Sequence, residues 1–169
     1  GSVQEVISNN SNKEEMYQII DSLEPDGGTP LYDAVYHGLQ LAQNNKSINS
    51  IVLFSDGGDN QSRQSYNSVS ALLNFIKIPI YTIGFLSGDT NIRVLQTLSD
   101  ESKGIYFSSP DLVDFQVIFS QISSVIQNQY EITFKSTKPG KKGDKKTIKV
   151  RYRNLLGKVT TVEEEYIQP

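Results

Sequence analysis

Three segments of the chain each contain a short continuous run of mostly apolar residues, without the alternation that marks a strand with one exposed face. They are residues 50–56, 78–85 and 104–107. Short continuous apolar runs are typical of strands that are buried on both faces, as in a parallel sheet covered by helices. The pattern therefore predicts three strands of one parallel sheet.

Apolar residues at helical spacing precede and separate these strands. Before the first strand we expect two helices that bury Met16, Ile19, Ile20 and Leu23, and then Leu31, Val35, Leu39 and Ala42. Ser11 and Glu14 have the spacing of a capping box at the start of the first helix. Further helices are expected near residues 65–76, 91–101 and 112–127. This alternation predicts an α/β fold with a doubly wound, mostly parallel sheet.

The pattern changes after Gln129. Residues 130–134, 147–152 and 159–166 alternate between apolar and polar side chains, which predicts a small antiparallel β extension with one face exposed to solvent. Residues 1–129 carry 14 acids and six bases, whereas residues 130–169 carry five acids and ten bases. Two units with different surfaces are therefore expected: an α/β unit over residues 3–129 and the extension over residues 130–169. Residues 1–2 are interpreted as a cloning remnant.

Composition excludes several classes of protein. The chain has no cysteine, and therefore neither a disulfide scaffold nor a thiolate site. No apolar run approaches the roughly 18 to 20 residues that cross a bilayer. Phosphate-binding and dinucleotide-binding glycine motifs are absent, and Ser87 lacks the spacing of a nucleophile elbow. His37 is the only histidine and is expected to be an ordinary helical residue. We therefore expect a protein that is not an enzyme.

The lysines between residues 135 and 149 raise the possibility of binding to nucleic acid. No aromatic residues are interleaved with residues 138–146, and Pro139, Gly140 and Gly143 indicate a turn. The lysine-rich segment is therefore interpreted as a solvated loop, and no nucleic-acid partner is expected.

Two polar segments are expected at the carboxyl end of the sheet, where open parallel sheets bind ligands. Asp56 ends the first apolar run and is followed by Asp59 and Asn60. A Gly-Gly-Thr turn ending at Thr29 precedes a predicted helix. The alternative is structural: Thr29 would cap its helix, Asp56 would close a loop, and Asp59 and Asn60 would make turn contacts.

These two segments, together with residues 80–85 and 104–107, resemble the von Willebrand factor A family over roughly residues 3–128. The resemblance implies that Thr29 and Asp56 are ligands of a metal-ion-dependent adhesion site for Mg²⁺, or for Mn²⁺ or Ca²⁺. A protein partner would complete the ion's coordination with an Asp or Glu. The residues expected to contact that partner are Asp26, Gly28, Asp59 and Asn60.

The family's Asp-x-Ser-x-Ser motif, which ends its first strand, does not occur in this sequence. Residues 3–8 resemble a later strand of the family, so the first strand, first helix and second strand are expected to be missing. Metal binding by this chain alone is then expected to be weak or absent. The strand at residues 51–56 would lack a neighbour and recruit a second copy, an exchanged segment or the tail.

The resemblance implies an adhesion-type protein-binding module outside the cytoplasm, with a β extension like those of bacterial surface and envelope proteins. Two alternatives remain open. One is a metal-independent structural or assembly subunit that pairs with a chaperone-like ATPase or a surface complex. The other is a small enzyme of flavodoxin-like shape, which the absence of a combined nucleophile, base and cofactor loop disfavours.

Overall fold

The computed structural model describes residues 3, 5, 12–24, 27–45, 50–85, 91–109, 113–128, 140–153 and 156–168. Contacts along the chain divide it into two compact units, Gly1–Gln129 and Tyr130–Pro169. The predicted strands at residues 3–8 and 130–134 lie outside the described residues, except for Val3 and Glu5.

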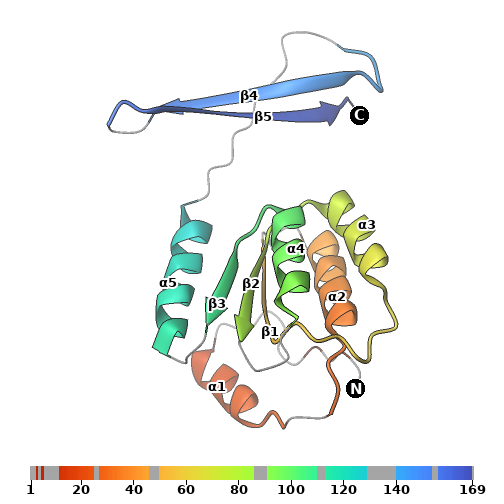
Figure 1. Cartoon of the computed structure of the whole chain (residues 1–169), viewed down its shortest axis with the longest axis vertical. Coiled ribbons are helices and arrows are strands. Elements are labelled where there is room, and N and C mark those ends of the chain that lie inside the picture. The colour runs from red at the N-terminus through yellow and green to blue at the C-terminus, as the bar shows by residue number, and fades with distance from the viewer. Residues whose placement is uncertain are drawn as a thin grey trace. The chain divides into compact units, whose positions relative to one another are not determined.

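The first unit alternates helices and strands (Figure 1). Its elements are α1 (Lys13–Asp21), α2 (Leu31–Asn44), β1 (Ile51–Ser55), α3 (Tyr66–Ile76), β2 (Ile80–Phe85), α4 (Ile92–Ser102), β3 (Tyr106–Ser109) and α5 (Val113–Gln127). The three strands form one parallel sheet in the order β1-β2-β3, with Ile51 opposite Ile80 and Thr82 opposite Tyr106. The predicted α/β fold with a parallel sheet is confirmed.

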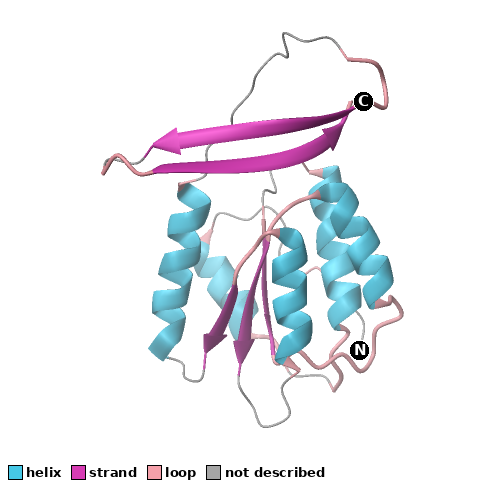
Figure 2. Ribbon diagram, turned by 45° about the horizontal axis from the view of Figure 1, so that its top comes forward, coloured by secondary structure: helices cyan, strands magenta, loops and turns pink. Residues whose placement is uncertain are grey.

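Helices cover both faces of this sheet (Figure 2). On one face, residues of α2, α3 and α4 pack with Ile80 of β2. On the other face, Ile118 and Ile122 of α5 pack with Tyr81 and Ile83 of β2. Strand β2 is therefore buried from both sides, as its continuous apolar sequence predicted.

Strand β1 departs from that prediction. Its residues alternate between half-buried and exposed, and Val52 and Phe54 are 41% and 53% exposed. Phe54 contacts Phe115 of α5 with ring centroids 5.0 Å apart, so α5 covers this part of the sheet incompletely. Within the described residues β1 pairs only with β2 and lies at the edge of the sheet.

Helix α1 begins one residue later than the capping-box prediction. Its cap is Asn12, whose side-chain oxygen accepts hydrogen bonds from the backbone of Glu14 and Glu15 at 3.2 and 3.4 Å. Ser11 lies outside the described residues. The prediction that α1 buries its apolar residues is wrong: none of its residues is buried, and Ile20 is 52% exposed. The reason is that no other described element packs closely on α1.

The second unit contains an antiparallel pair of strands, β4 (Lys145–Arg153) and β5 (Val159–Ile167). This confirms two strands of the predicted extension. Side chains alternate between the two faces of the pair: Val150 lies opposite Val162 on one face, and Lys149 and Glu163 form a salt bridge of 2.6 Å on the other. The predicted lysine-rich loop ends earlier than expected, because Lys145 already belongs to β4.

Candidate functional site

The Gly-Gly-Thr turn and the loop that follows β1 lie side by side. The backbone N–H of Thr29 donates to Oδ1 of Asn60 at 2.7 Å, and the backbone N–H of Asn60 donates to the carbonyl of Thr29 at 3.1 Å. Gly28 lies directly beside the Gln61 side chain, because a Cβ on Gly28 would come within 2.1 Å of Cδ of Gln61. The two polar segments therefore meet at the carboxyl end of β1.

Asp56 is the first residue after β1 and is exposed to solvent. Its Oδ1 accepts the backbone N–H of Gly58 at 3.2 Å, which folds the loop back over the end of the strand. Gly57 has φ +80°, and a Cβ there would come within 2.3 Å of the Asn91 carbonyl oxygen at the start of α4. Glycine is required here both by the backbone conformation and by this close approach.

Asp59 caps helix α2 from a distance of 27 residues in sequence. Pro30 precedes α2 and provides no side-chain cap. Oδ1 of Asp59 instead accepts the backbone N–H of Tyr32 at 3.3 Å and the hydroxyl of Ser62. A carboxylate at a helix N-terminus satisfies a free backbone donor and lies favourably in the field of the helix.

Asp33 forms a second link between α2 and the same loop, which sequence reasoning did not identify. Its carboxylate accepts the backbone N–H groups of Gln64 at 2.7 Å and of Arg63 at 3.0 Å, and its own N–H donates to the Ser62 hydroxyl. The hydrogen bonds from Gln64 and Arg63 hold the pKa of Asp33 below its usual value. The only sequence signal was an acid in the first turn of a helix.

These contacts define what the site offers a metal ion. Within the described parts of the chain, no three His, Cys, Asp or Glu side chains gather as metal ligands. Thr29 supplies a hydroxyl and Asp56 a carboxylate, whereas Oδ1 of Asp59 already serves α2 and Ser62. Asp26 lies outside the described residues. Two ligands do not fit a tight site for Mg²⁺, which prefers six oxygen ligands in near-octahedral geometry.

The other predicted residues take positioning roles or lie apart from the site. Gly28 and Asn60 hold the two loops together through the contacts with Gln61 and Thr29. His37 is half-buried on α2. None of the helices in the described residues is long and apolar enough to cross a bilayer.

Comparison with known proteins identifies the fold family. The family model described as von Willebrand factor type A domain matches residues 4–107. The solved structure of the conserved hypothetical protein BatB from Bacteroides thetaiotaomicron is similar, with a TM-score of 0.52, 15% identity, and coverage of 70% of this chain and 71% of that chain. At this identity the likeness shows the fold alone.

A second solved structure, an uncharacterized membrane spanning protein from Vibrio fischeri, has a TM-score of 0.43 and 16% identity. The match covers 68% of this chain and 66%, just under two thirds, of that chain. No curated protein matches the sequence.

Proposed function

Because this chain belongs to the von Willebrand factor type A domain family, we propose that it is a protein-binding module whose contact surface is the carboxyl end of the parallel sheet. Domains of this family are commonly protein-interaction modules. The observation that carries the proposal is the pair of hydrogen bonds between Thr29 and Asn60, which holds the Gly-Gly-Thr turn beside the loop that begins at Asp56. Two loops from separate segments thus form one polar surface.

In this proposal the Thr29 hydroxyl and the Asp56 carboxylate contribute two ligands to a divalent-cation site for Mg²⁺, Mn²⁺ or Ca²⁺. The remaining ligands come from outside the described residues, and the partner contributes an Asp or Glu. A bound ion would supply an electrophilic point of attachment for that carboxylate. Support comes from the position of Asp56 directly after β1 and from its exposure, which leaves its carboxylate accessible to a ligand.

Gly28, Asp59 and Asn60 support the surface through their internal contacts. Asp59 fixes the start of α2, and Asn60 fixes Thr29, so both loops keep their position before a partner arrives. Such preorganisation reduces the conformational entropy that is lost on binding. No catalytic step is part of the proposal, and a location outside the cytoplasm remains a prediction.

Titration with Mn²⁺, followed by electron paramagnetic resonance, tests the two ligands. We expect weak binding by the chain, with a dissociation constant on the order of 1 mM because only two protein ligands are present. Asp56→Ala and Thr29→Ala should each weaken binding further, whereas the exposed control Asp100→Ala should not. Micromolar binding, or equal binding by Asp56→Ala and the unmodified chain, would contradict the assignment.

Partner capture separates this function from the metal-independent alternative. The immobilised chain is exposed to extract from its source cells, with either Mg²⁺ or EDTA, alongside a variant that combines Thr29→Ala with Asp56→Ala. The proposal expects the same proteins to be lost in EDTA and in the variant. Retention of those proteins under both conditions would instead assign the chain to a structural or assembly role that requires no ion.

A further inference from the structure

Strand β1 carries an exposed apolar patch on the face of the sheet that α5 covers. Val52 and Phe54 are 41% and 53% exposed. The Phe54 ring contacts Phe115 of α5, and Phe115 in turn stacks on Phe119 with ring centroids 6.3 Å apart. Phe119 is itself 49% exposed. These four residues are called the β1 patch, and apolar side chains that are exposed side by side mark an interaction surface.

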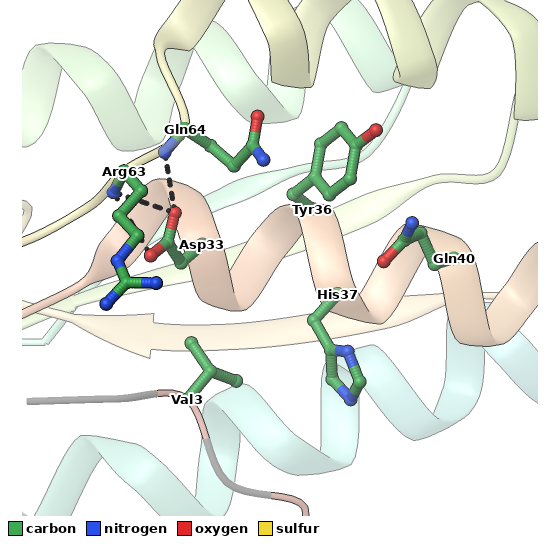
Figure 3. A pocket seen from close by; sticks show the side chains of 7 residues that line it. All are labelled: Val3, Asp33, Tyr36, His37, Gln40, Arg63 and Gln64. Carbon is green, nitrogen blue, oxygen red and sulfur yellow. Dashed lines mark hydrogen bonds between the residues drawn. The ribbon is translucent and has the colours of Figure 1, made fainter.

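The opposite face of β1 is covered by the protein. Ile51 and Leu53 pack against the core that α2, α3 and α4 form with β2. The side of α2 that borders a hollow of about 520 Å³ is polar, with Asp33, His37 and Gln40 in its lining (Figure 3). A partner at β1 therefore has apolar surface to cover only at the β1 patch.

The backbone of β1 offers hydrogen bonds at the same edge. The N–H of Ile51 donates to the Pro79 carbonyl at 3.0 Å, and β1 runs parallel to β2 from there. Alternate residues of a strand direct their backbone groups to the same side, so those of Val52 and Phe54 are directed away from β2. In the part of the chain that the structure describes, β2 is the one strand that pairs with β1. Strand β1 also has neither a charged residue nor a proline, which natural edge strands use against pairing.

We propose that β1 pairs with β1 of a second copy of this chain, antiparallel and about a twofold axis at Leu53. In this register Val52 lies opposite Phe54 of the second copy, and Phe54 lies opposite its Val52. The outward-directed backbone groups of these residues then meet as hydrogen-bonded pairs. The axis is perpendicular to the sheet, so the two β1 patches lie side by side on one face. Such a contact is self-complementary, as a twofold interface requires.

The distribution of charge favours a second copy at this place. Residues 1–129 carry 14 acids and six bases, so most contacts between two copies of this unit would bring like charges together. Strand β1 and residues 115–127 of α5 contain no charged residue. Two copies can therefore meet at the β1 patch without that repulsion. Depletion of charge and enrichment in aromatic residues are also typical of the buried centre of a protein interface.

Cross-linking tests the register directly, because the chain has no cysteine of its own. Val52→Cys and Phe54→Cys are prepared as separate whole-chain proteins, mixed in equal amounts, oxidised in EDTA and analysed by mass spectrometry. Opposite residues of a hydrogen-bonded antiparallel pair have Cα atoms about 5.5 Å apart, which a disulfide spans. We expect a disulfide between the two variants in the mixture. Each variant alone should cross-link about tenfold less, because the same position in the two copies is offset by two residues along the strands, beyond a disulfide's reach.

Light scattering after size-exclusion chromatography measures the association itself. The unmodified chain of 18.9 kDa should approach twice that mass as its concentration rises. Val52→Lys should raise the dissociation constant of the dimer about tenfold or more, because each dimer would bring two ammonium groups into an apolar contact. Phe75→Lys is the matched control on α3, where Phe75 is 72% exposed, and should associate normally. Far-UV circular dichroism checks that each variant is folded.

Three results would overturn the inference. They are a chain that stays monomeric at every concentration, equal association of Val52→Lys and the unmodified chain, and cross-linking of the mixture no greater than that of each variant alone. Association without the mixed cross-link would indicate an exchanged segment or a different surface. Because both measurements are made in EDTA, they succeed or fail independently of the proposed metal site at Thr29 and Asp56.

Discussion

Replacement of Asp59 by alanine distinguishes a residue that supports the fold from one that only touches a partner. Oδ1 of Asp59 accepts from the Tyr32 backbone and the Ser62 hydroxyl, and both bonds disappear in Asp59→Ala. Loss of a helix cap costs about 0.5–2 kcal/mol. The lost bond to Ser62 contributes about 0.5–1.5 kcal/mol. We therefore expect the free energy of unfolding to fall by about 2 kcal/mol, since neither bond is deeply buried.

Urea denaturation followed by circular dichroism at 222 nm measures this change. All described helices belong to the first unit, so the helical signal reports on that unit and not on the β4–β5 pair. For a chain of this size the loss corresponds to a decrease of about 4–8 °C in Tm. Asp100→Ala, an exposed acid on α4, should change stability by less than about 0.5 kcal/mol. If Asp59→Ala were as stable as that control, the capping role would be refuted and a role confined to partner contact would be favoured.

Two further predictions concern the same loop. Gly57→Ala should lower the free energy of unfolding by more than about 2 kcal/mol. A left-handed backbone costs about 1–2 kcal/mol for a residue with a Cβ, and this Cβ would also meet the Asn91 carbonyl. A decrease of less than about 1 kcal/mol in a urea titration would contradict this geometry. Asp33 has a depressed pKa in the folded state, so it adds stability above the ordinary pKa of 3.8 that is lost as the pH falls through its lower folded value. Asp33→Asn should therefore flatten the dependence of the urea midpoint on pH below about pH 4, and equal slopes for the two proteins would refute the shift.

The sequence predicted those parts of the fold that depend on local pattern. The continuous apolar run of β2 indicated burial on both faces, and Ile80 and Ile83 are both fully buried. The Gly-Gly-Thr turn and Asp56 were expected at the same end of the sheet, because parallel strands present their carboxyl ends together. The structure brings the two segments into contact through Thr29 and Asn60.

Other features depend on partners that are distant in sequence. Asp33 looked like an ordinary acid in a first helical turn, yet its hydrogen bonds reach 30 and 31 residues along the chain. Met16 and Ile20 have the spacing of a buried helix face, but spacing cannot show whether another element packs there. Likewise, the apolar run of β1 did not reveal that Phe54 would be half exposed, because exposure depends on the extent of α5.

The hydrogen bonds that tie the loop after β1 to helix α2 have a mechanical consequence. Asp59 and Ser62 engage the first turn of α2, and Asp33 engages the loop in return. Displacement of this loop would therefore either break these hydrogen bonds or move the start of α2 with it.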